Sequence, residues 1–331
     1  MPRTSSFHPA SSASGRASPF IVGANLPWIT YGTDFGASAW YPEGGLSVRP
    51  LALDRLHEAC AVLERDGISL VRVFLLCDGR SGILYDTNGL PVAPDASLFA
   101  DIDALLTVAR AHNLRVMPVL FDFHLCGPLR LVNGVQLGGR AQLIEPQGSK
   151  ALMDRVLAPV FERYGQHDTI EAWDLMNEPE WCLRRSRSFG LPAGFGRPPA
   201  SFPVLQTFLQ EVVRCAHALT RQPVTVGSAG TWCFDLVRPL GLDFYQVHWY
   251  ERFGWATLER PVNELELDRP VILGEFSGAR SRLGAARVLD TAERAGYHGA
   301  LVWSVLSEDE ASGYPPEIVA WVRERDRRAN A

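Results

Sequence analysis

Several features that mark particular classes of protein are missing from this sequence of 331 residues. No apolar run reaches the roughly 18 residues that cross a bilayer, so we expect no membrane partner. The net charge is −5, and a chain without a basic excess is a poor candidate for binding nucleic acid. The six cysteines are scattered without a CxxC pair, which argues against a zinc site and a disulfide scaffold. We therefore expect free thiols in a reducing compartment, no metal and no other cofactor.

Nucleotide-binding and metalloprotease signatures are also absent. The first candidate strand leads into Gly23-Ala24-Asn25-Leu26-Pro27 in place of GxGxxG, and neither a Walker A loop nor HExxH occurs. Residues 1–18 are rich in serine, alanine, proline and glycine and lack the apolar core of a signal peptide. We predict a disordered tail over 1–18 and a cytoplasmic protein, or a secreted one if a signal has been removed.

Strand-like and helix-like segments alternate along the rest of the chain. The eight candidate strands are residues 20–26, 68–76, 114–123, 169–176, 224–227, 244–249, 271–275 and 300–303. The candidate helices are residues 51–65, 98–111, 150–164, 204–219, 281–295 and 317–323. This alternation predicts the α/β class and one (β/α)8 barrel domain over residues 19–329, with a doubly wound open sheet as the alternative.

Two of the candidate strands lead into a glutamate. Glu178 follows an apolar run and precedes Pro179, which cannot extend a strand ladder. Glu275 follows a second apolar run, 97 residues further on (275 − 178). Because the active site of such a barrel lies at the C-terminal ends of its strands, both carboxylates should face one cleft. Glycoside hydrolysis needs such a pair, one to protonate the leaving oxygen and one to attack or to activate water.

Polar and aromatic residues stand at the ends of the other strands, and together they resemble a known family. The motifs are Val71-Arg72-Val73, Phe121-Asp122-Phe123-His124, Asn177-Glu178-Pro179, His248-Trp249-Tyr250, Gly274-Glu275-Phe276 and Trp303-Ser304. In this order and on these strands, they resemble the retaining family 5 glycoside hydrolases of clan A, the cellulase and mannanase superfamily. The resemblance covers nearly the whole barrel.

The resemblance implies a retaining enzyme that cleaves a β-linked oligo- or polysaccharide by double displacement. Glu178 is then the general acid/base and Glu275 the nucleophile, separated by about 5–5.5 Å, against roughly 6.5–9.5 Å for inversion. Asn177 is expected to bind the sugar 2-hydroxyl and Trp303 to form the floor beneath the sugar, and the other substrate-binding positions implied are Arg72, His124, His248 and Tyr250. Arg72 and Tyr250 should favour the charged form of Glu275 and lower its pKa.

The loops at the same end of the barrel should select the substrate. Trp28 and Trp40 belong to a long aromatic loop after the first strand and are candidates for stacking on sugar rings. Residues 181–201 form a candidate lid, in which Arg184, Arg185 and Arg187 are most simply solvated. Residues 125–146 would add a wall. Long inserts close one end of a pocket, which favours exo action or short substrates over an open endo cleft.

Other interpretations use the same residues. A transglycosylase would keep both glutamates and take a sugar as the acceptor, whereas a catalytically silent carbohydrate-binding barrel would usually have lost one of them. Family 39 or family 2 barrels of the same clan share the pair. The residues also have plainer structural roles: Arg72 could only neutralise a buried acid, the two histidines could be core residues, and Trp303 could pack the barrel. The sequence leaves the sugar, its linkage and the oligomeric state open.

Overall fold

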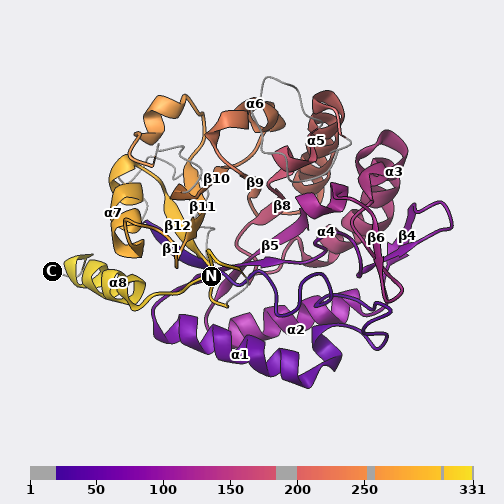
Figure 1. Cartoon of the computed structure of the whole chain (residues 1–331), viewed down its shortest axis with the longest axis horizontal. Helices are drawn as coiled ribbons and strands as arrows, with labels where there is room; N and C mark the ends of the chain where they lie inside the picture. The colour runs from indigo at the N-terminus through magenta and orange to yellow at the C-terminus, as the bar shows by residue number, and fades with distance from the viewer. Residues whose placement is uncertain (1–19, 184–199, 252–257, 307–308, 330–331) are drawn as a thin grey trace.

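The computed structural model describes residues 20–183, 200–251, 258–306 and 309–329 (Figure 1). Eight parallel strands close into a barrel in the order β1-β12-β11-β10-β9-β8-β5-β2, which confirms the predicted (β/α)8 fold and excludes the open sheet. Their bounds are Ile21–Asn25 (β1), Leu70–Phe74 (β2), Arg115–Asp122 (β5), Trp173–Asn177 (β8), Val224–Ser228 (β9), Tyr245–Trp249 (β10), Val271–Ser277 (β11) and Gly299–Trp303 (β12). The predicted tail and the three arginines at 184–187 lie outside the described residues.

Helices surround the strands, with α1 and α2 along one side and α7 and α8 beside β1 and β12 (Figure 1). The α-helices are Pro50–Arg65 (α1), Leu98–Ala111 (α2), Pro146–Leu152 (α3), Ala158–Tyr164 (α4), Phe202–Leu219 (α5), Phe234–Val237 (α6), Ala285–Ala295 (α7) and Pro316–Ala329 (α8). Short 3-10 turns are Leu46–Val48 (η1), Phe123–Cys126 (η2), Ala141–Ile144 (η3), Pro179–Cys182 (η5), Thr231–Cys233 (η7), Arg238–Leu240 (η8) and Val262–Leu265 (η10). No helix in the described ranges is long and apolar enough to cross a bilayer.

The helix α1 shows how the pattern of apolar residues fixes each outer element. It begins at Pro50, where proline loses no intrahelical hydrogen bond. Leu56 and Leu63 are buried on one face, whereas Leu51 is 82% exposed on the other. A seven-residue spacing returns a helical side chain to nearly the same face, so this face packs on the barrel. The helix matches the predicted range of 51–65 closely.

Several predicted elements differ from the observed ones: α7 begins at Ala285 and not at residue 281, and α8 continues to Ala329 and does not end at residue 323. The fourth strand begins at Trp173 and not at residue 169, because Ile170 makes only an isolated bridge to Val116. The helix predicted over 150–164 begins at Pro146 and is interrupted by a π-helical turn, Met153–Leu157 (η4). Pro159 follows this turn and has no N–H to donate, which accounts for the change in helical hydrogen bonding.

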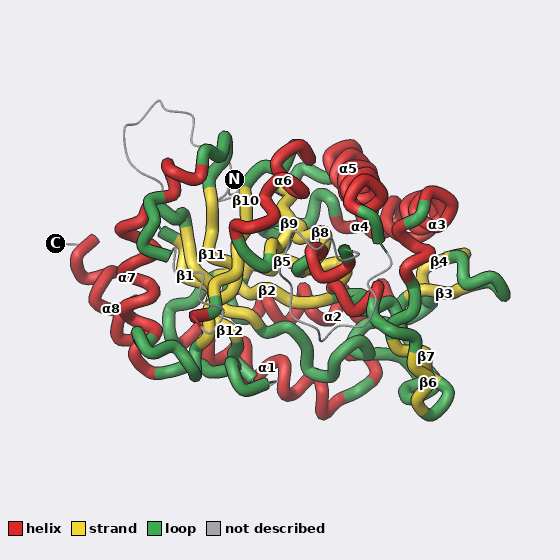
Figure 2. Tube along the Cα trace, turned by 45° about the horizontal axis from the view of Figure 1, so that its top comes forward, coloured by secondary structure: helices red, strands yellow, loops and turns green. Residues whose placement is uncertain are grey.

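Two hairpins outside the barrel were not predicted. They are formed by Ile83–Tyr85 (β3) with Pro91–Pro94 (β4), and by Arg130–Val132 (β6) with Val135–Leu137 (β7). Both views place them on the side of the molecule away from α7 and α8 (Figure 2). The prolines of β4 argue against a strand. The turn Asn133-Gly134 of the second hairpin has positive φ at both residues, a type I′ signal that was present in the sequence.

Side chains inside the barrel form layers. Leu70, Phe244 and Leu301 belong to an apolar cluster with Met117, Ala172 and Ile272. Because side chains alternate along a strand, residues two positions further on point inward as well. On β2 and β10 these residues are Arg72 and Gln246, which are 0% and 1% exposed. A polar layer therefore lies between the apolar interior and the C-terminal mouth. Trp173 at the start of β8 is fully buried.

Candidate active site

Arg72 on β2 is the centre of the polar layer. Its Nε and Nη2 atoms donate to Asp174 Oδ2 at 2.9 and 2.8 Å. Its Nη1 atom donates to Glu275 Oε1 at 2.7 Å and to Asn25 Oδ1 at 3.0 Å. Its Nη2 atom also donates to Asn177 Oδ1 at 2.7 Å. A fully buried cation is thus paired with two carboxylates, and its donors fix the direction of the Asn177 amide.

Two glycines make room for this layer. A Cβ atom at Gly227 would lie 2.9 Å from both Arg72 Nη2 and Gln246 Nε2, and one at Gly274 would lie 2.4 Å from Gln246 Cγ. The space is used for hydrogen bonds, because Gln246 Nε2 donates to Asp174 Oδ2 at 2.6 Å. The Gly227 N–H donates to Asp174 Oδ1 at 3.1 Å. Asp174 is therefore held by donors from three strands.

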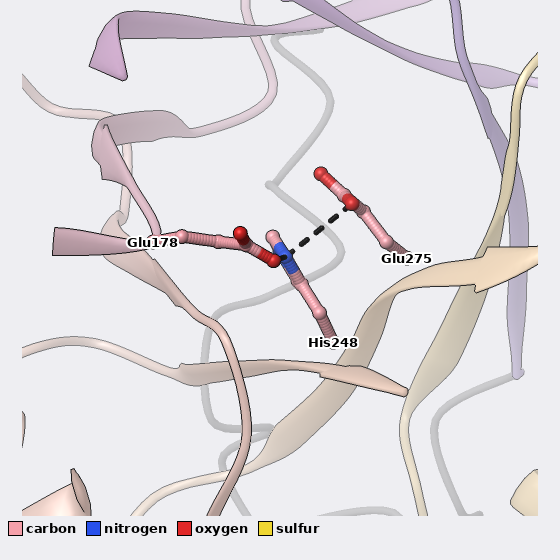
Figure 3. Close-up of side chains that lie close together, drawn as sticks. All are labelled: Glu178, His248 and Glu275. Atoms are coloured by element: carbon pink, nitrogen blue, oxygen red, sulfur yellow. Dashed lines mark hydrogen bonds and ion pairs between the residues drawn. The ribbon is translucent and has the colours of Figure 1, made fainter. Parts of the chain in front are cut away.

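Glu178 and Glu275 lie on either side of His248 (Figure 3). The Nδ1 atom of His248 is 2.9 Å from Glu178 Oε1 and 3.4 Å from Glu275 Oε2. One carboxylate oxygen of each glutamate and one ring nitrogen all lie within 4.8 Å of one another. The two carboxyl groups therefore approach one another at a single site, as the double displacement of a retaining glycosidase requires. The same spacing would admit a metal ion, but donors from the protein already satisfy both carboxylates.

The two glutamates have different surroundings. The side chain of Glu275 is 4% exposed, and its Oε2 atom accepts a hydrogen bond from the Tyr250 hydroxyl at 2.7 Å. The side chain of Glu178 is 15% exposed. Burial raises the pKa of Glu275 above its ordinary value, although His248, Arg72 and Tyr250 act to lower it. The lowered pKa expected from the sequence is therefore wrong, because the loss of solvent outweighs the favourable neighbours.

His248 and Tyr250 both stay neutral beside these carboxylates. Burial lowers the pKa of His248 to about 4, so its ring is uncharged at neutral pH. A neutral ring that faces two carboxylates through Nδ1 carries its proton there. Its Nε2 atom then has no hydrogen-bond partner among the described residues. Burial raises the pKa of Tyr250 well above its ordinary value, which keeps the hydroxyl a donor.

The backbone at Glu178 has an unusual conformation. Its φ and ψ angles are 47° and 51°, in the left-handed region that residues other than glycine rarely adopt. Its N–H donates to the Gly227 carbonyl at 2.6 Å. The turn η5 begins at the next residue, and Trp181 in this turn donates its indole N–H to Glu178 Oε2 at 2.7 Å. The sequence places Trp181 only in the candidate lid, whereas the structure shows that it contacts Glu178 directly.

Aromatic rings form one wall of the mouth. Trp28 makes edge contacts with Tyr31, Phe74 and Trp303, at ring-centroid distances of 4.8, 5.5 and 5.9 Å. Trp28 and Trp303 are therefore neighbours, as two sugar-binding residues would have to be. Trp40 donates its indole N–H to Val132 O of the β6–β7 hairpin at 3.0 Å, and the Arg80 guanidinium lies over the rings of both Tyr31 and Trp40, at 4.6 and 5.7 Å.

His124 does not stand at the end of a strand, where the sequence predicts it. The strand β5 ends at Asp122, and His124 follows in η2 with its side chain exposed. Its ring makes an edge contact with Tyr31 at 6.0 Å, and Tyr31 in turn donates to Asp122 Oδ2 at 2.6 Å. The alternative of a core histidine is excluded for His124, and its contact is with the aromatic wall and not with the Arg72 network.

Comparisons with known proteins bear on this arrangement, although no family model matches the sequence. The chain is 24% identical over 320 residues to a mannan endo-1,4-beta-mannosidase of Mytilus edulis, covering 86% of this chain and 83% of the relative. It is 26% identical over 332 residues to one from Cryptopygus antarcticus, covering 88% and 82%. The crystal structure of endo-1,4-beta-mannanase from Eisenia fetida matches with a TM-score of 0.73 at 24% identity, covering 92% and 90%. The chain is a retaining β-glycoside hydrolase.

The resemblance of this glycoside hydrolase to family 5 and clan A is confirmed, and its substrate is a carbohydrate. Sequence reasoning named the residues at the mouth of the enzyme but missed the layer below them, which includes Asn25, Asp174 and Gln246. Gln246 could have been predicted from the sequence, because it precedes the inward-facing His248 by two positions on one strand. The pairing of Asp174 with Arg72 joins residues 102 positions apart and has no local signal.

Proposed function

We propose that this hydrolase cleaves internal β-1,4 bonds of a mannan, with Glu178 as general acid/base and Glu275 as nucleophile. The observation that carries the assignment is the pair of carboxylate oxygens within 4.8 Å of one another at the ends of β8 and β11. The substrate class is supported by the two relatives, both of which are named as mannan endo-1,4-beta-mannosidases.

Glu275 suits the role of nucleophile because its direction is fixed. Hydrogen bonds from Arg72 and Tyr250 hold one oxygen each. In the first step a Glu275 oxygen attacks the anomeric carbon, the glycosidic bond breaks, and Glu178 gives its proton to the departing oxygen. The product of this step is a covalent glycosyl ester of Glu275.

Glu178 suits the role of acid/base because it is the more exposed of the two carboxyl groups and can meet a leaving group or a water molecule. In the second step Glu178 takes a proton from water, the hydroxide oxygen bonds to the anomeric carbon, and the ester to Glu275 breaks. Two displacements return the sugar to its β configuration. The Asn177 amide, oriented by Arg72, is placed to bind the 2-hydroxyl, and Trp303 with Trp28 offers apolar ring surface to the sugar.

Two interpretations of the loops differ in whether the enzyme cuts inside the polysaccharide (endo) or at its end (exo). Long inserts favour exo action, whereas both relatives are named as endo-acting mannosidases. We propose endo action, for which a mixture of short oligosaccharides should appear early in mannan digestion. Release of mannose alone from the start would support the exo reading instead. Products longer than the starting oligosaccharide would support transglycosylation.

The test of the mechanism uses aryl β-glycosides and β-1,4-linked mannooligosaccharides, with the first-released anomer followed by NMR. We expect the β-anomer from manno-configured substrates and little turnover of the others. Glu275→Ala should abolish turnover. Glu178→Ala should spare substrates with activated leaving groups and be partly rescued by azide, because azide needs no general base. Full activity of either variant would contradict the assignment.

We also propose that the enzyme works in a reducing compartment, in line with its cysteines. All six are free thiols, and five of them are buried. Enzyme purified without reductant and then unfolded should titrate as six thiols per chain. A lower count would mean that disulfides form in the native compartment.

A further inference from the structure

Glu180 is a buried acid beside the active site that the proposed mechanism does not use. It lies in η5, two residues after Glu178, and is 0% exposed. Burial raises its pKa to about 8, and the negative charge of Glu178 acts in the same direction. Glu180 is therefore protonated at neutral pH. An uncharged carboxyl can remain buried without a cation, so its role must come from its hydrogen bonds.

The contacts of Glu180 are with the end of the neighbouring strand β9. Its Oε2 atom accepts a hydrogen bond from the backbone N–H of Ala229 at 3.2 Å. The Ser228 hydroxyl lies beside the carboxyl and acts to lower its pKa. Glu180 Oε1 and Ser228 Oγ have no other partner among the described residues. The Glu180 side chain thus spans from η5 to the residues just after β9.

A second hydrogen bond joins the same two segments. The N–H of Glu178 donates to the Gly227 carbonyl at 2.6 Å. The chain at 178–180 is therefore tied to residues 227–229 through one backbone bond and one side-chain bond. Between these ties Glu178 keeps its left-handed conformation, which costs about 1 kcal/mol or more for a residue with a Cβ atom. Such a conformation persists only where the surroundings impose it.

We propose that Glu180 is a positioning residue: its buried carboxyl anchors η5 to the end of β9 and thereby sets the direction in which Glu178 enters the active site. The inference rests on the proposed role of Glu178 as acid/base. Trp181 belongs to the same turn and donates to Glu178, so loss of the anchor would displace the acid and its donor together. A displacement of about 1 Å in a catalytic group can cost on the order of 100-fold in rate.

The experiment compares Glu180→Ala with Glu180→Gln on aryl β-mannooligosides whose leaving groups differ in acidity. Poor leaving groups need protonation by Glu178, whereas highly activated ones do not. Glu180→Ala should lower kcat/KM, which reports formation of the glycosyl ester, about 100-fold for poor leaving groups and by less than about 3-fold for activated ones. Glu180→Gln keeps the size and an acceptor oxygen and should stay within about 3-fold of the parent enzyme on both.

Glu171 provides the matched control. It is another buried glutamate, 3% exposed, and pairs with Arg115 at 3.0 Å just before β8 begins, at the opposite end of the barrel. Glu171→Ala and Glu171→Gln should change the melting temperature without changing the ratio of activities on poor and activated substrates. If Glu180→Ala does not fold, Glu180→Asp replaces it, because the shorter side chain keeps the acid but cannot reach Ala229.

Each outcome decides one question. Equal losses of Glu180→Ala on both substrates, no loss at all, or equal behaviour of the Ala and Gln variants would overturn the positioning role. In a Glu178→Ala background, Glu180→Ala should add no further loss specific to poor leaving groups. If Glu178→Ala alone leaves activity intact, the proposed function fails. If Glu178→Ala behaves as an acid/base variant while Glu180→Ala affects both substrates equally, only this inference fails.

Discussion

Trp181 donates its indole N–H to Glu178 Oε2 at 2.7 Å, from three residues along the same short turn. The other oxygen of Glu178 faces His248 Nδ1 at 2.9 Å. Both carboxyl oxygens of Glu178 therefore have a nitrogen partner, one from its own loop and one from β10. The loop after β8 thus contains both Glu178 and the Trp181 donor that helps to hold its carboxyl group in place.

Replacing Trp181 by phenylalanine should weaken acid catalysis while leaving the fold intact. The ring is kept, but the donor to Glu178 is lost, and a hydrogen bond to a charged group is worth about 1.5–3 kcal/mol. We expect kcat on substrates with poor leaving groups to fall about 10- to 100-fold. Trp321→Phe is the control, since Trp321 makes a similar bond to Asp290 at 2.6 Å on the outer helices. Equal kinetics in the two variants would contradict the role of the donor.

Arg72→Met should destabilise the protein as well as inactivate it. The substitution leaves Asp174 and Glu275 buried without their cation, and breaking a buried ion pair from one side costs about 3–5 kcal/mol. Urea unfolding followed by circular dichroism measures the loss. Arg163→Met removes an arginine whose pair with Asp103 is about half exposed, and should cost less than about 1 kcal/mol. Similar losses in both variants would mean that the Arg72 network contributes little to stability.

Gly227→Ala tests whether the polar layer needs the space inside the barrel. The new methyl group would lie within 3.0 Å of Arg72, Gln246 and His248 nitrogens, and overpacking of this kind costs about 1–3 kcal/mol. We expect lower stability together with lower kcat. Gly241→Ala meets no atom within 4 Å, although its φ of 76° adds backbone strain, and it should lower stability without changing kcat. A Gly227→Ala variant with unchanged kcat would show that the layer tolerates displacement.

Glu180 should make the stability of the enzyme fall as the pH rises from about 4.5 to about 8. The unfolded chain releases this proton near the ordinary value of 4.5, whereas the folded chain holds it until about pH 8. The stabilisation is therefore complete below about pH 4.5 and is lost as the pH rises through about 8, at roughly 1.4 kcal/mol per pH unit. Glu180→Gln removes this loss, so its stability relative to the parent should rise by a few kcal/mol between about pH 5 and pH 8. Parallel unfolding curves for the two proteins would refute the raised pKa.

The barrel was predictable because its strands are short apolar runs separated by amphipathic helices, and because parallel strands place their ends at one face. The same logic placed Glu178 and Glu275 together. It failed for the pKa of Glu275, since the depth of burial depends on the whole assembly and not on the neighbours visible in a motif. The sequence also gives no sign of the contact between Trp40 and Val132, which lies 92 residues away in a hairpin outside the barrel. Long-range pairings of this kind leave no local pattern.

The polar layer beneath the glutamates also bears on how this protein could be redesigned. Asn25, Arg72, Asp174, Gln246 and Glu275 all belong to strands, so the positions of these residues in the polar layer do not depend on the loops above them. Loops tolerate insertion and exchange far better than barrel strands do. The loops after β1 and β5 can therefore be grafted from other barrels to change the sugar that is accepted, whereas an exchanged loop after β8 has to keep Glu178, Glu180 and Trp181.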